Sequence, residues 1–307
     1  MSGKPSLALV GPTASGKSEV AVVLAERLGA EVVSVDSMLV YRRMDIGTAK
    51  PGVRERARVP HHLIDVAEPE ERFSVARYQE LARATLAEIG RRDRRALLVG
   101  GSGLYFRAIV DDLGLPGTEA GTRRALEAEA AAVGARRLHA RLAELDPVAA
   151  GRIEPGNVRR TVRALEVAAI TGRPFSTYAS DWERYPSERV RAAGVFFARE
   201  LLARRIAARV ARMLSAGFLD EVRELMRRGL GSWLTASQAI GYAEMTRHLE
   251  GELSLEEAVA TTVKRTKALA RRQLAWFRRD PRIRWFEAGE DGAVALADEL
   301  EGYLAGG

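Results

Sequence analysis

A glycine-rich stretch of the chain carries residue types that bind phosphate. It reads GPTASGKS from Gly11 to Ser18 and fits the pattern G-x-x-x-x-G-K-[ST]. Glycines let successive backbone N–H groups turn toward phosphate oxygens, and the N-terminus of a following helix adds partial positive charge. The Lys17 ammonium would meet the terminal phosphates, and the Ser18 hydroxyl is a candidate ligand for Mg²⁺. The motif therefore predicts phosphate binding, but leaves open whether the phosphate belongs to a nucleotide.

A carboxylate, Asp36, follows the second apolar stretch. Residues 32–35 read as a buried strand, so Asp36 would stand at the carboxyl end of that strand, where open α/β sheets bind ligands. There a carboxylate would hold Mg²⁺ through water or act as a general base toward an acceptor. The alternative is a cap on the following turn, a common role of aspartate. Its position favours the functional role.

Strands alternating with helices must position these groups. Residues 6–10, 31–35 and 95–99 are short apolar runs, each followed by a turn or a helical pattern, and residues 19–28 have helical periodicity. Such alternation predicts an α/β fold with a parallel sheet flanked by helices. Strand signals return at 194–197, after which the chain is mostly helical. The polar, glycine-containing residues 41–51 predict a surface loop near the site.

A helical stretch interrupts this alternation. From about 119 to 170 the chain is rich in Ala, Arg, Glu and Leu with helical periodicity, broken by glycine and proline. We therefore expect two parts. Residues 1–115 and 190–307 would form the α/β core, and residues 116–189 would form an inserted all-helical subdomain.

Composition excludes several kinds of site. The 307 residues include no cysteine, which excludes disulfides, zinc–thiolate sites, iron–sulfur clusters and thiol nucleophiles. The four histidines lack the spacing of metal ligands, and we expect them to be structural. The sequence shows neither a signal peptide nor an apolar run of membrane-spanning length, which predicts a cytoplasmic protein.

Basic residues gather near the C-terminus. Lys and Arg exceed Asp and Glu by 48 − 41 = 7, and residues 264–284 hold a cluster of the basic ones around one acid, Asp280. The cluster consists of Lys264, Arg265, Lys267, Arg271, Arg272, Arg278, Arg279, Arg282 and Arg284. It is a candidate polyanion-binding segment, and a solvated helix with a tail is the alternative. We expect Trp276 and Phe277, within this segment, to pack in the core rather than stack on bases.

Several stretches, taken in order, resemble the tRNA dimethylallyltransferase family, isopentenyltransferases that modify tRNA. They are GPTASGKS from Gly11, VDSMLVYRRMDIGTAKP from Val35, PHHLID from Pro60, LVGGSGLYF from Leu98, Asp146-Pro147 with RALEV from Arg163, Arg205-Ile206 with Arg209, Gly217-Phe218 with Glu221-Val222, QAIGY from Gln238, and RRQ from Arg271 with Trp276-Phe277. A kinase that shared only the phosphate loop would not reproduce the later matches. The resemblance implies a phosphate-loop (P-loop) NTPase-like fold.

The resemblance also implies a reaction, the transfer of a dimethylallyl group from dimethylallyl diphosphate to N6 of the adenosine 3′ of the tRNA anticodon. Asp36 would take the amine proton, while Lys17, Thr13 and Mg²⁺ on Ser18 would stabilise the leaving diphosphate. The family's further diphosphate-clamping arginine falls on Arg209, one helical turn from Arg205; without the resemblance, a solvated helix face would explain this pair. The diphosphate would bind to Gly11, Pro12, Thr13, Ala14, Ser15, Gly16, Lys17 and Ser18.

The tRNA partner is likewise implied by the resemblance. The target adenine would flip out of the anticodon arm into a channel. The contacts would be Asp36, Ser37, Met38, Leu39, Ser102, Arg159, Arg160, Thr161, Val162 and Arg163. Leu39 and Arg159 stand where the family commonly has Gln, which weakens a hydrogen-bonding role at Leu39 and adds charge at Arg159. Gln238 and Tyr242 are further candidates for the RNA-facing cleft, and the basic segment would grip phosphates. We expect a monomer that does not bind membranes.

Two other classes of protein share the phosphate loop. A small-molecule kinase would use ATP and an acid facing a hydroxyl acceptor, and the insertion would mimic its mobile lid. A non-catalytic or ATP-driven nucleic-acid binder would need a hydrophobic strand ending in acidic residues. The strand at 96–99 ends instead in Gly100 and Gly101, which argues against that class.

Overall fold

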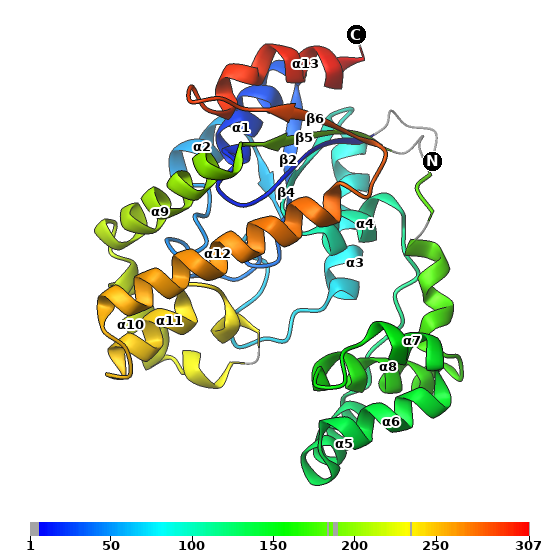
Figure 1. Cartoon of the computed structure of the whole chain (residues 1–307). Coiled ribbons are helices and arrows are strands. Elements are labelled where there is room, and N and C mark those ends of the chain that lie inside the picture. The colour runs from blue at the N-terminus through cyan, green and yellow to red at the C-terminus, as the bar shows by residue number, and fades with distance from the viewer. Residues whose placement is uncertain (1–5, 183, 187–189, 234, 307) are drawn as a thin grey trace. The chain divides into compact units, whose positions relative to one another are not determined.

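The computed structural model describes residues 6–182, 184–186, 190–233 and 235–306. Within these ranges, six strands form one sheet in the order β3-β2-β4-β1-β5-β6, and every neighbouring pair is parallel (Figure 1). The strands are β1 (Ser6–Val10), β2 (Ala30–Val35), β3 (His61–His62), β4 (Arg95–Gly100), β5 (Val190–Phe196) and β6 (Ile283–Glu287). The expected fold class, a parallel sheet flanked by helices, is confirmed.

The sheet differs from the expectation at its edges. The runs at 6–10, 31–35 and 95–99 are strands to within one residue, whereas β5 begins at Val190, before the expected 194–197. β3 and β6 were not expected. β6 lies inside and beyond the basic segment, where exposed Arg284 and Glu287 alternate with buried Ile283 and Phe286. Its pairing with β5 makes it a strand, and that pairing is not local in sequence.

Two helical layers cover the sheet. Strand residues Leu7, Leu9 and Leu97 pack on one face with α1 (Lys17–Leu28) and α13 (Ala297–Ala305), the blue and red helices of Figure 1. Alternate residues such as Ala8 and Leu98 pack on the other face with α3 (Val75–Arg91), α4 (Gly103–Val110) and α12 (Leu255–Phe277). The period-two pattern of the strands therefore places a core on each side.

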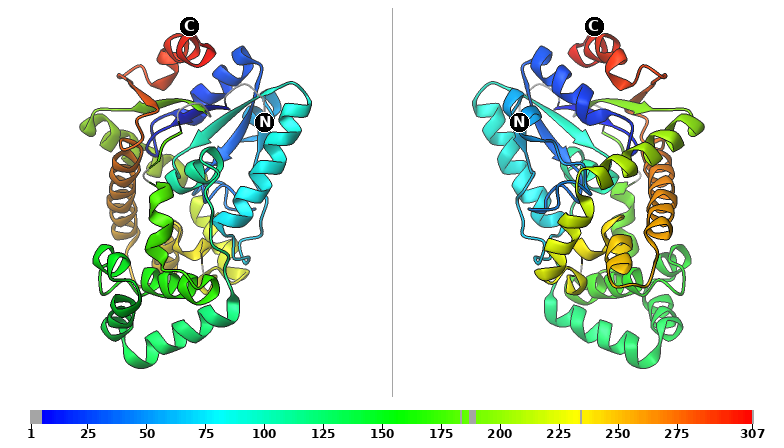
Figure 2. Two further views of the ribbon diagram at one scale, coloured as in Figure 1. Left: turned by 90° about the vertical axis from the view of Figure 1, so that its right-hand side faces the viewer. Right: turned by 90° about the vertical axis from the view of Figure 1, so that its left-hand side faces the viewer.

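Further helices accompany these layers. They are α2 (Val53–Arg58), α9 (Arg199–Ser215), α10 (Phe218–Arg227) and α11 (Tyr242–Leu249), with short 3₁₀ segments η3 (Leu230–Ser232), η4 (Ala236–Gln238) and η5 (Ala293–Leu296). α12 packs against α9 and α11, which the two side views of Figure 2 also show. Ser254 caps α12, and Glu257 completes a capping box, which fixes where this long helix begins. In the part of the chain that the structure describes, no helix is both long and apolar enough to span a bilayer.

The chain divides into two compact units, residues 1–111 with 187–307, and residues 112–186. The second unit contains α5 (Ala120–Val133), α6 (Ala135–Leu145), α7 (Pro147–Arg152), α8 (Val158–Thr171) and the 3₁₀ segment η1 (Phe175–Trp182). It has its own apolar core around Leu126, Leu138, Leu142 and Leu165. Its limits differ from the expected insertion, 116–189, by a few residues at each end.

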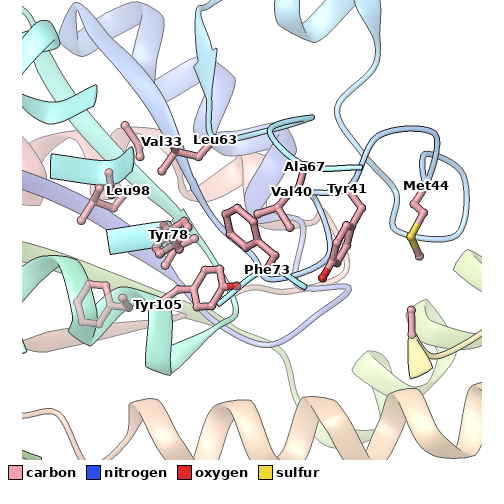
Figure 3. Close-up of a cluster of buried hydrophobic side chains, with 14 of the residues drawn as sticks. Val33, Val40, Tyr41, Met44, Leu63, Ala67, Phe73, Tyr78, Leu98 and Tyr105 are labelled. Atoms are coloured by element: carbon pink, nitrogen blue, oxygen red, sulfur yellow. The ribbon is translucent and has the colours of Figure 1, made fainter. Parts of the chain in front are cut away.

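The segment after β2 is buried more deeply than its sequence indicated. Val40, Tyr41 and Met44 are at most 1% exposed, and Figure 3 shows them with Phe73 and Ala67 in one apolar cluster. The rings of Tyr41 and Phe73 pack edge to face, with centroids 6.5 Å apart. The expectation of a surface loop over 41–51 is therefore wrong for its first part. Its apolar side chains fix the backbone that follows Asp36.

Candidate functional site

The phosphate loop joins β1 to α1. At Gly11 the backbone has φ +148°, and a Cβ there would lie 2.2 Å from the carbonyl oxygen of Val195 on β5. Any side chain at this position would push the loop away from the sheet. α1 then begins at Lys17 without a side-chain cap, so its first-turn N–H groups point from the loop with their partial positive charge available to an anion.

Lys17 is folded back into the loop. Its Nζ donates hydrogen bonds to the Pro12 carbonyl oxygen at 2.6 Å and to Ser15 Oγ at 3.3 Å. Burial lowers the pKa of Lys17 to about 7, with the Asp36 charge acting to raise it and Arg209 to lower it. Since an incoming anion would favour the charged ammonium, Lys17 is a group whose protonation responds to ligand binding.

Two arginines of α9 hold the loop from outside. Arg209 donates to Thr13 Oγ1 at 3.2 Å and to the Thr48 carbonyl oxygen at 3.1 Å. Arg205, one turn earlier, donates from Nε to the Ala14 carbonyl oxygen at 3.1 Å. Burial lowers the pKa of Arg209, while the charge of Asp36 raises it. Both arginines therefore face the loop, as a shared helix face allows, and neither belongs to a merely solvated surface.

Asp36 stands where β2 ends, and it lines the same cavity as Lys17 and Arg209. Its Oδ1 also accepts the backbone N–H of Met38 at 2.8 Å, so the carboxylate holds the turn that follows the strand. The capping role and the position at the cavity thus coexist in one residue. Asp36 is half-buried, which leaves part of the carboxylate accessible to a ligand.

The cavity that these groups share has a volume of about 1020 Å³, at the upper end of the roughly 300–1,000 Å³ typical of ligand pockets. Its cationic wall includes the loop residues 13–18 with Arg205, Arg209 and Arg212. Its apolar lining comes from Leu39, Ile46, Ile64, Val99, Leu201 and Met213. The cavity therefore offers both an anion site and apolar surface beside Asp36.

Gln273 of α12 is a site residue whose side-chain contacts the sequence did not indicate. Its Oε1 accepts the Thr13 backbone N–H at 2.8 Å, and its Nε2 donates to the Gly101 carbonyl oxygen at 3.0 Å. Nearby, Ser102 caps α4 by accepting the Tyr105 N–H at 3.4 Å, and its own N–H donates to the Val35 carbonyl oxygen at 3.0 Å. The only signal for Gln273 was its place in the RRQ stretch.

The predicted RNA contacts fall in both units. In the first, Ser37, Met38 and Leu39 are half-buried after β2, and Leu39 lines the cavity. In the second, α8 exposes Arg159 and Arg160, whereas Thr161 and Val162 are at most 3% exposed within the core of that unit. Arg163 is half-buried and donates to the carbonyl oxygens of Pro116 and Gly117 and to Glu166.

The basic segment separates into exposed and buried cations. Lys264, Arg271 and Arg272 are exposed on α12, and Lys267 is half-buried there. Arg282 is only 4% exposed and forms ion pairs with Asp111 and Asp280, so it is not a free surface charge as the segment suggested. The one acid of the segment, Asp280, is therefore the partner of one of its arginines.

The structure also places the aromatic residues and histidines that the sequence analysis singled out. The packing role is confirmed for Phe277, which is fully buried, and for Trp276, whose ring lies 5.4 Å from it. Tyr242 does not line a cleft, because it is fully buried and donates its hydroxyl to Glu221. The histidines are hydrogen-bonded structural residues. His61, His139 and His248 contact backbone carbonyl oxygens, and His62 contacts Glu31.

Comparisons with known proteins agree on one family. Residues 39–280 match the family described as IPP transferase. A tRNA dimethylallyltransferase of Streptomyces coelicolor is 52% identical over 92% of this chain and 90% of its own length. One from a Nocardioides species is 50% identical over 95% of this chain and 94% of its own. The crystal structure of a Bacillus halodurans tRNA isopentenylpyrophosphate transferase is 40% identical, has a TM-score of 0.71, and covers 99% of this chain and 96% of its own.

Proposed function

The chain belongs to the tRNA dimethylallyltransferase family, and we propose from this premise how its cavity carries out the transfer. It is a prenyltransferase with a P-loop NTPase-like fold, and its substrate is tRNA. The comparisons give no support to a small-molecule kinase. We propose that the prenyl donor is dimethylallyl diphosphate and that the acceptor is the exocyclic N6 of the adenosine 3′ of the anticodon.

One observation carries this proposal: an anion site and a carboxylate share one cavity. Lys17, Arg205 and Arg209 surround the phosphate loop, and Asp36 lies on the same cavity wall. Apolar side chains line the space beside them. This arrangement suits a donor with a charged diphosphate and an apolar five-carbon group, and an acceptor that must lose a proton.

The proposed reaction is a displacement at the first carbon of the prenyl group. A bond forms between that carbon and N6 while the bond to the diphosphate oxygen breaks, and the electron pair leaves with the diphosphate. Lys17, Arg209, Thr13 and the loop amides would stabilise this developing charge. Asp36 would accept the N6 proton as the new bond forms, since an amine conjugated with a purine is a weak nucleophile.

We propose Mg²⁺ as the metal ion of this site. Ser18 fits the ion, because this residue is exposed in the first turn of α1 and lines the cavity. Mg²⁺ keeps several waters and binds substrate phosphates, so a single hydroxyl ligand from the protein suits it. When bound, it would neutralise diphosphate charge.

The tRNA would approach with its target adenine flipped out, because a stacked base hides its N6 amine. We propose that Asp36, Ser37, Met38 and Leu39 contact this nucleotide from the end of β2, together with Ser102. On the second unit, Arg159 and Arg160 would contact RNA directly, since they are exposed. The next three residues of the same helix, Thr161, Val162 and Arg163, are partly or wholly buried and would support that surface from within the unit. The exposed cations of α12 would bind phosphates.

We propose that the enzyme works as a monomer in the cytoplasm, where tRNA substrates are found. The experiment that tests the function is incubation with labelled dimethylallyl diphosphate and unmodified tRNA carrying adenosine after the anticodon. We expect Mg²⁺-dependent label in the tRNA and prenylated adenosine in its nucleoside mass spectrum. The absence of label, together with ATP turnover on a small alcohol, would overturn the proposal.

A further inference from the structure

Glu221, in the first turn of α10, is a carboxylate with an unusual number of donors. It accepts the backbone N–H groups of three successive residues, Asp45 at 3.0 Å, Ile46 at 2.7 Å and Gly47 at 3.1 Å. The hydroxyl of Tyr242 donates to the same carboxylate at 2.6 Å. Charged acceptors make stronger hydrogen bonds than neutral ones, so Glu221 is a firm anchor for residues 45–47.

Packing holds the same three residues against α10 and α11. A Cβ at Gly47 would lie 2.3 Å from the ring of Phe218 and 2.5 Å from that of Tyr242. These two rings meet edge to face, with centroids 5.0 Å apart. Only a glycine lets the backbone approach this closely, and that approach brings the amides within reach of Glu221.

The anchored residues run directly into the cavity. Asp45, Ile46 and Thr48 line it. The Thr48 carbonyl oxygen accepts one N–H of Arg209 at 3.1 Å, and Arg209 donates another to Thr13 Oγ1 in the phosphate loop at 3.2 Å. The backbone of residues 45–48 is therefore hydrogen-bonded to Glu221 at one end and to the Arg209 guanidinium at the other.

We propose that Glu221 is a positioning residue for the diphosphate, acting through residues 45–48 and Arg209. The inference rests on the proposed function, in which Arg209 contacts the diphosphate. Glu221 fixes the amides of 45–47, the fixed segment presents the Thr48 carbonyl oxygen, and that oxygen orients the planar guanidinium. An arginine fork binds well only in a defined plane, so a misplacement of about 1 Å is enough to cost on the order of a hundredfold.

The same helix offers a matched control. Glu224 lies one turn after Glu221 and pairs with Arg227 and Arg228 at the surface. Glu221→Gln keeps the shape of the side chain but removes the charge and replaces one acceptor oxygen with a donor. Glu224→Gln makes the same chemical change away from residues 45–47. A general effect of lost charge at α10 would appear in both variants.

The test measures binding of inorganic pyrophosphate to the free enzyme by titration calorimetry, in a double-mutant cycle with Arg209→Gln. We expect Glu221→Gln to weaken pyrophosphate about tenfold or more, Glu224→Gln to leave it unchanged, and Glu221→Gln to add less than twofold in the Arg209→Gln background. If the double variant weakened pyrophosphate binding by the full product of the two single-variant factors, the inference would be overturned. Because this measurement needs no transfer to tRNA, it stands apart from the label experiment.

A second measurement covers the case in which Glu221→Gln fails to fold. In the wild-type protein, the amide hydrogens of Asp45, Ile46 and Gly47 should exchange slowly with solvent, since the Glu221 carboxylate holds all three. Fast exchange at these amides in the folded enzyme would also overturn the inference.

Discussion

Gln273 and Thr13, 260 positions apart, are joined by a hydrogen bond of 2.8 Å from the Thr13 backbone N–H to the Gln273 side-chain oxygen. The bond ties the phosphate loop to α12, the helix that carries the exposed cations Lys264, Arg271 and Arg272. The other end of the same amide donates to the Gly101 carbonyl oxygen, just after the end of β4. One side chain thus connects the anion site with the helix proposed to bind RNA phosphates.

This connection predicts the effect of Gln273→Glu. The carboxylate keeps an acceptor for Thr13 but faces the Gly101 carbonyl oxygen without a donor and adds negative charge beside the anion site. We expect the KM for the prenyl diphosphate to rise about tenfold, as for a buried group left unsatisfied, about 1–3 kcal/mol. Steady-state kinetics at saturating tRNA measures it. Ala84→Glu, exposed on α3 and outside the cavity lining, is the control, and equal KM values in all three proteins would contradict the prediction.

A change at Asp36 separates its two roles. Asp36→Asn retains an oxygen to accept the Met38 N–H but cannot take a proton from the acceptor amine. We expect kcat to fall about 10²–10⁴-fold, the usual contribution of a general base, while pyrophosphate binding is largely kept. Single-turnover transfer and calorimetry report the two quantities. Asp36→Ala should lose transfer as well. A variant that retained wild-type kcat would remove Asp36 from the base role.

The lowered pKa of Lys17 predicts proton uptake on binding. Burial sets this pKa to about 7, so above pH 7 a large fraction of the free enzyme has neutral Lys17. A bound diphosphate favours the charged ammonium and raises the pKa, so binding should take up a proton and weaken as the pH rises through about 7. Calorimetry with pyrophosphate at pH 8, in buffers of different ionisation enthalpy, counts the protons. Lys17→Gln should abolish this uptake, and its persistence would assign the proton to another group.

The exposed cations of α12 predict a change in salt dependence. Lys264 and Arg271 lie seven residues apart, close to one helix face, and both are exposed. Replacing both with Gln should weaken tRNA binding and reduce the slope of log K against log salt by about 1 for each phosphate that is no longer neutralised. Filter binding from low to high salt measures the slope. Arg27→Gln on α1, at the opposite face of the sheet, should leave the slope unchanged. The double variant at Lys264 and Arg271 should bind pyrophosphate with wild-type affinity.

Arg282 predicts a stability effect instead. It belongs to a buried group of charges in which every side chain is at most 4% exposed. Arg282 pairs with Asp111 and Asp280, and Arg107 also pairs with Asp111. Asp111→Ala removes a carboxylate that pairs with two buried arginines, Arg107 and Arg282, which should lower the free energy of unfolding by about 3–5 kcal/mol. Urea denaturation measures this value. Asp298→Asn, in an exposed pair with Arg27, should change it by less than about 0.5 kcal/mol. Equal urea midpoints for Asp111→Ala and the wild-type protein would contradict the argument that this buried ion pair stabilises the fold.

The sequence predicted what local pattern determines. The phosphate loop, the strands at 6–10, 31–35 and 95–99, and the place of Asp36 at a strand end all follow from residue order and apolar periodicity. The sequence did not predict β6, because exposed Arg284 and Glu287 among its buried residues make this stretch resemble part of a basic tail. Its strand character depends on β5, whose paired residues lie 283 − 192 = 91 positions earlier, and no local signal conveys that pairing.

Side-chain partners far apart in sequence account for the other differences. Arg282 looks like one more surface cation until Asp111, 171 positions away, is placed beside it. Glu221 lies 174 to 176 positions from the amides of residues 45–47, so neither stretch alone indicated an anchor. Residues 41–51 seemed polar enough for a surface loop, yet Tyr41 and Met44 are buried, and the ring of Tyr41 packs against that of Phe73. Composition describes a segment, and its partners decide its burial.

The strand order also bears on how the chain folds during synthesis. β1, which leads into the phosphate loop, lies between β4 and β5, and β5 follows the whole helical unit in sequence. The ribosome therefore releases residues 112–186, a contiguous unit with its own core, before one side of β1 can be paired. Until then β1 has an open edge, which is a risk for aggregation. Translation pauses after β5 has emerged should therefore favour soluble enzyme more than pauses before it.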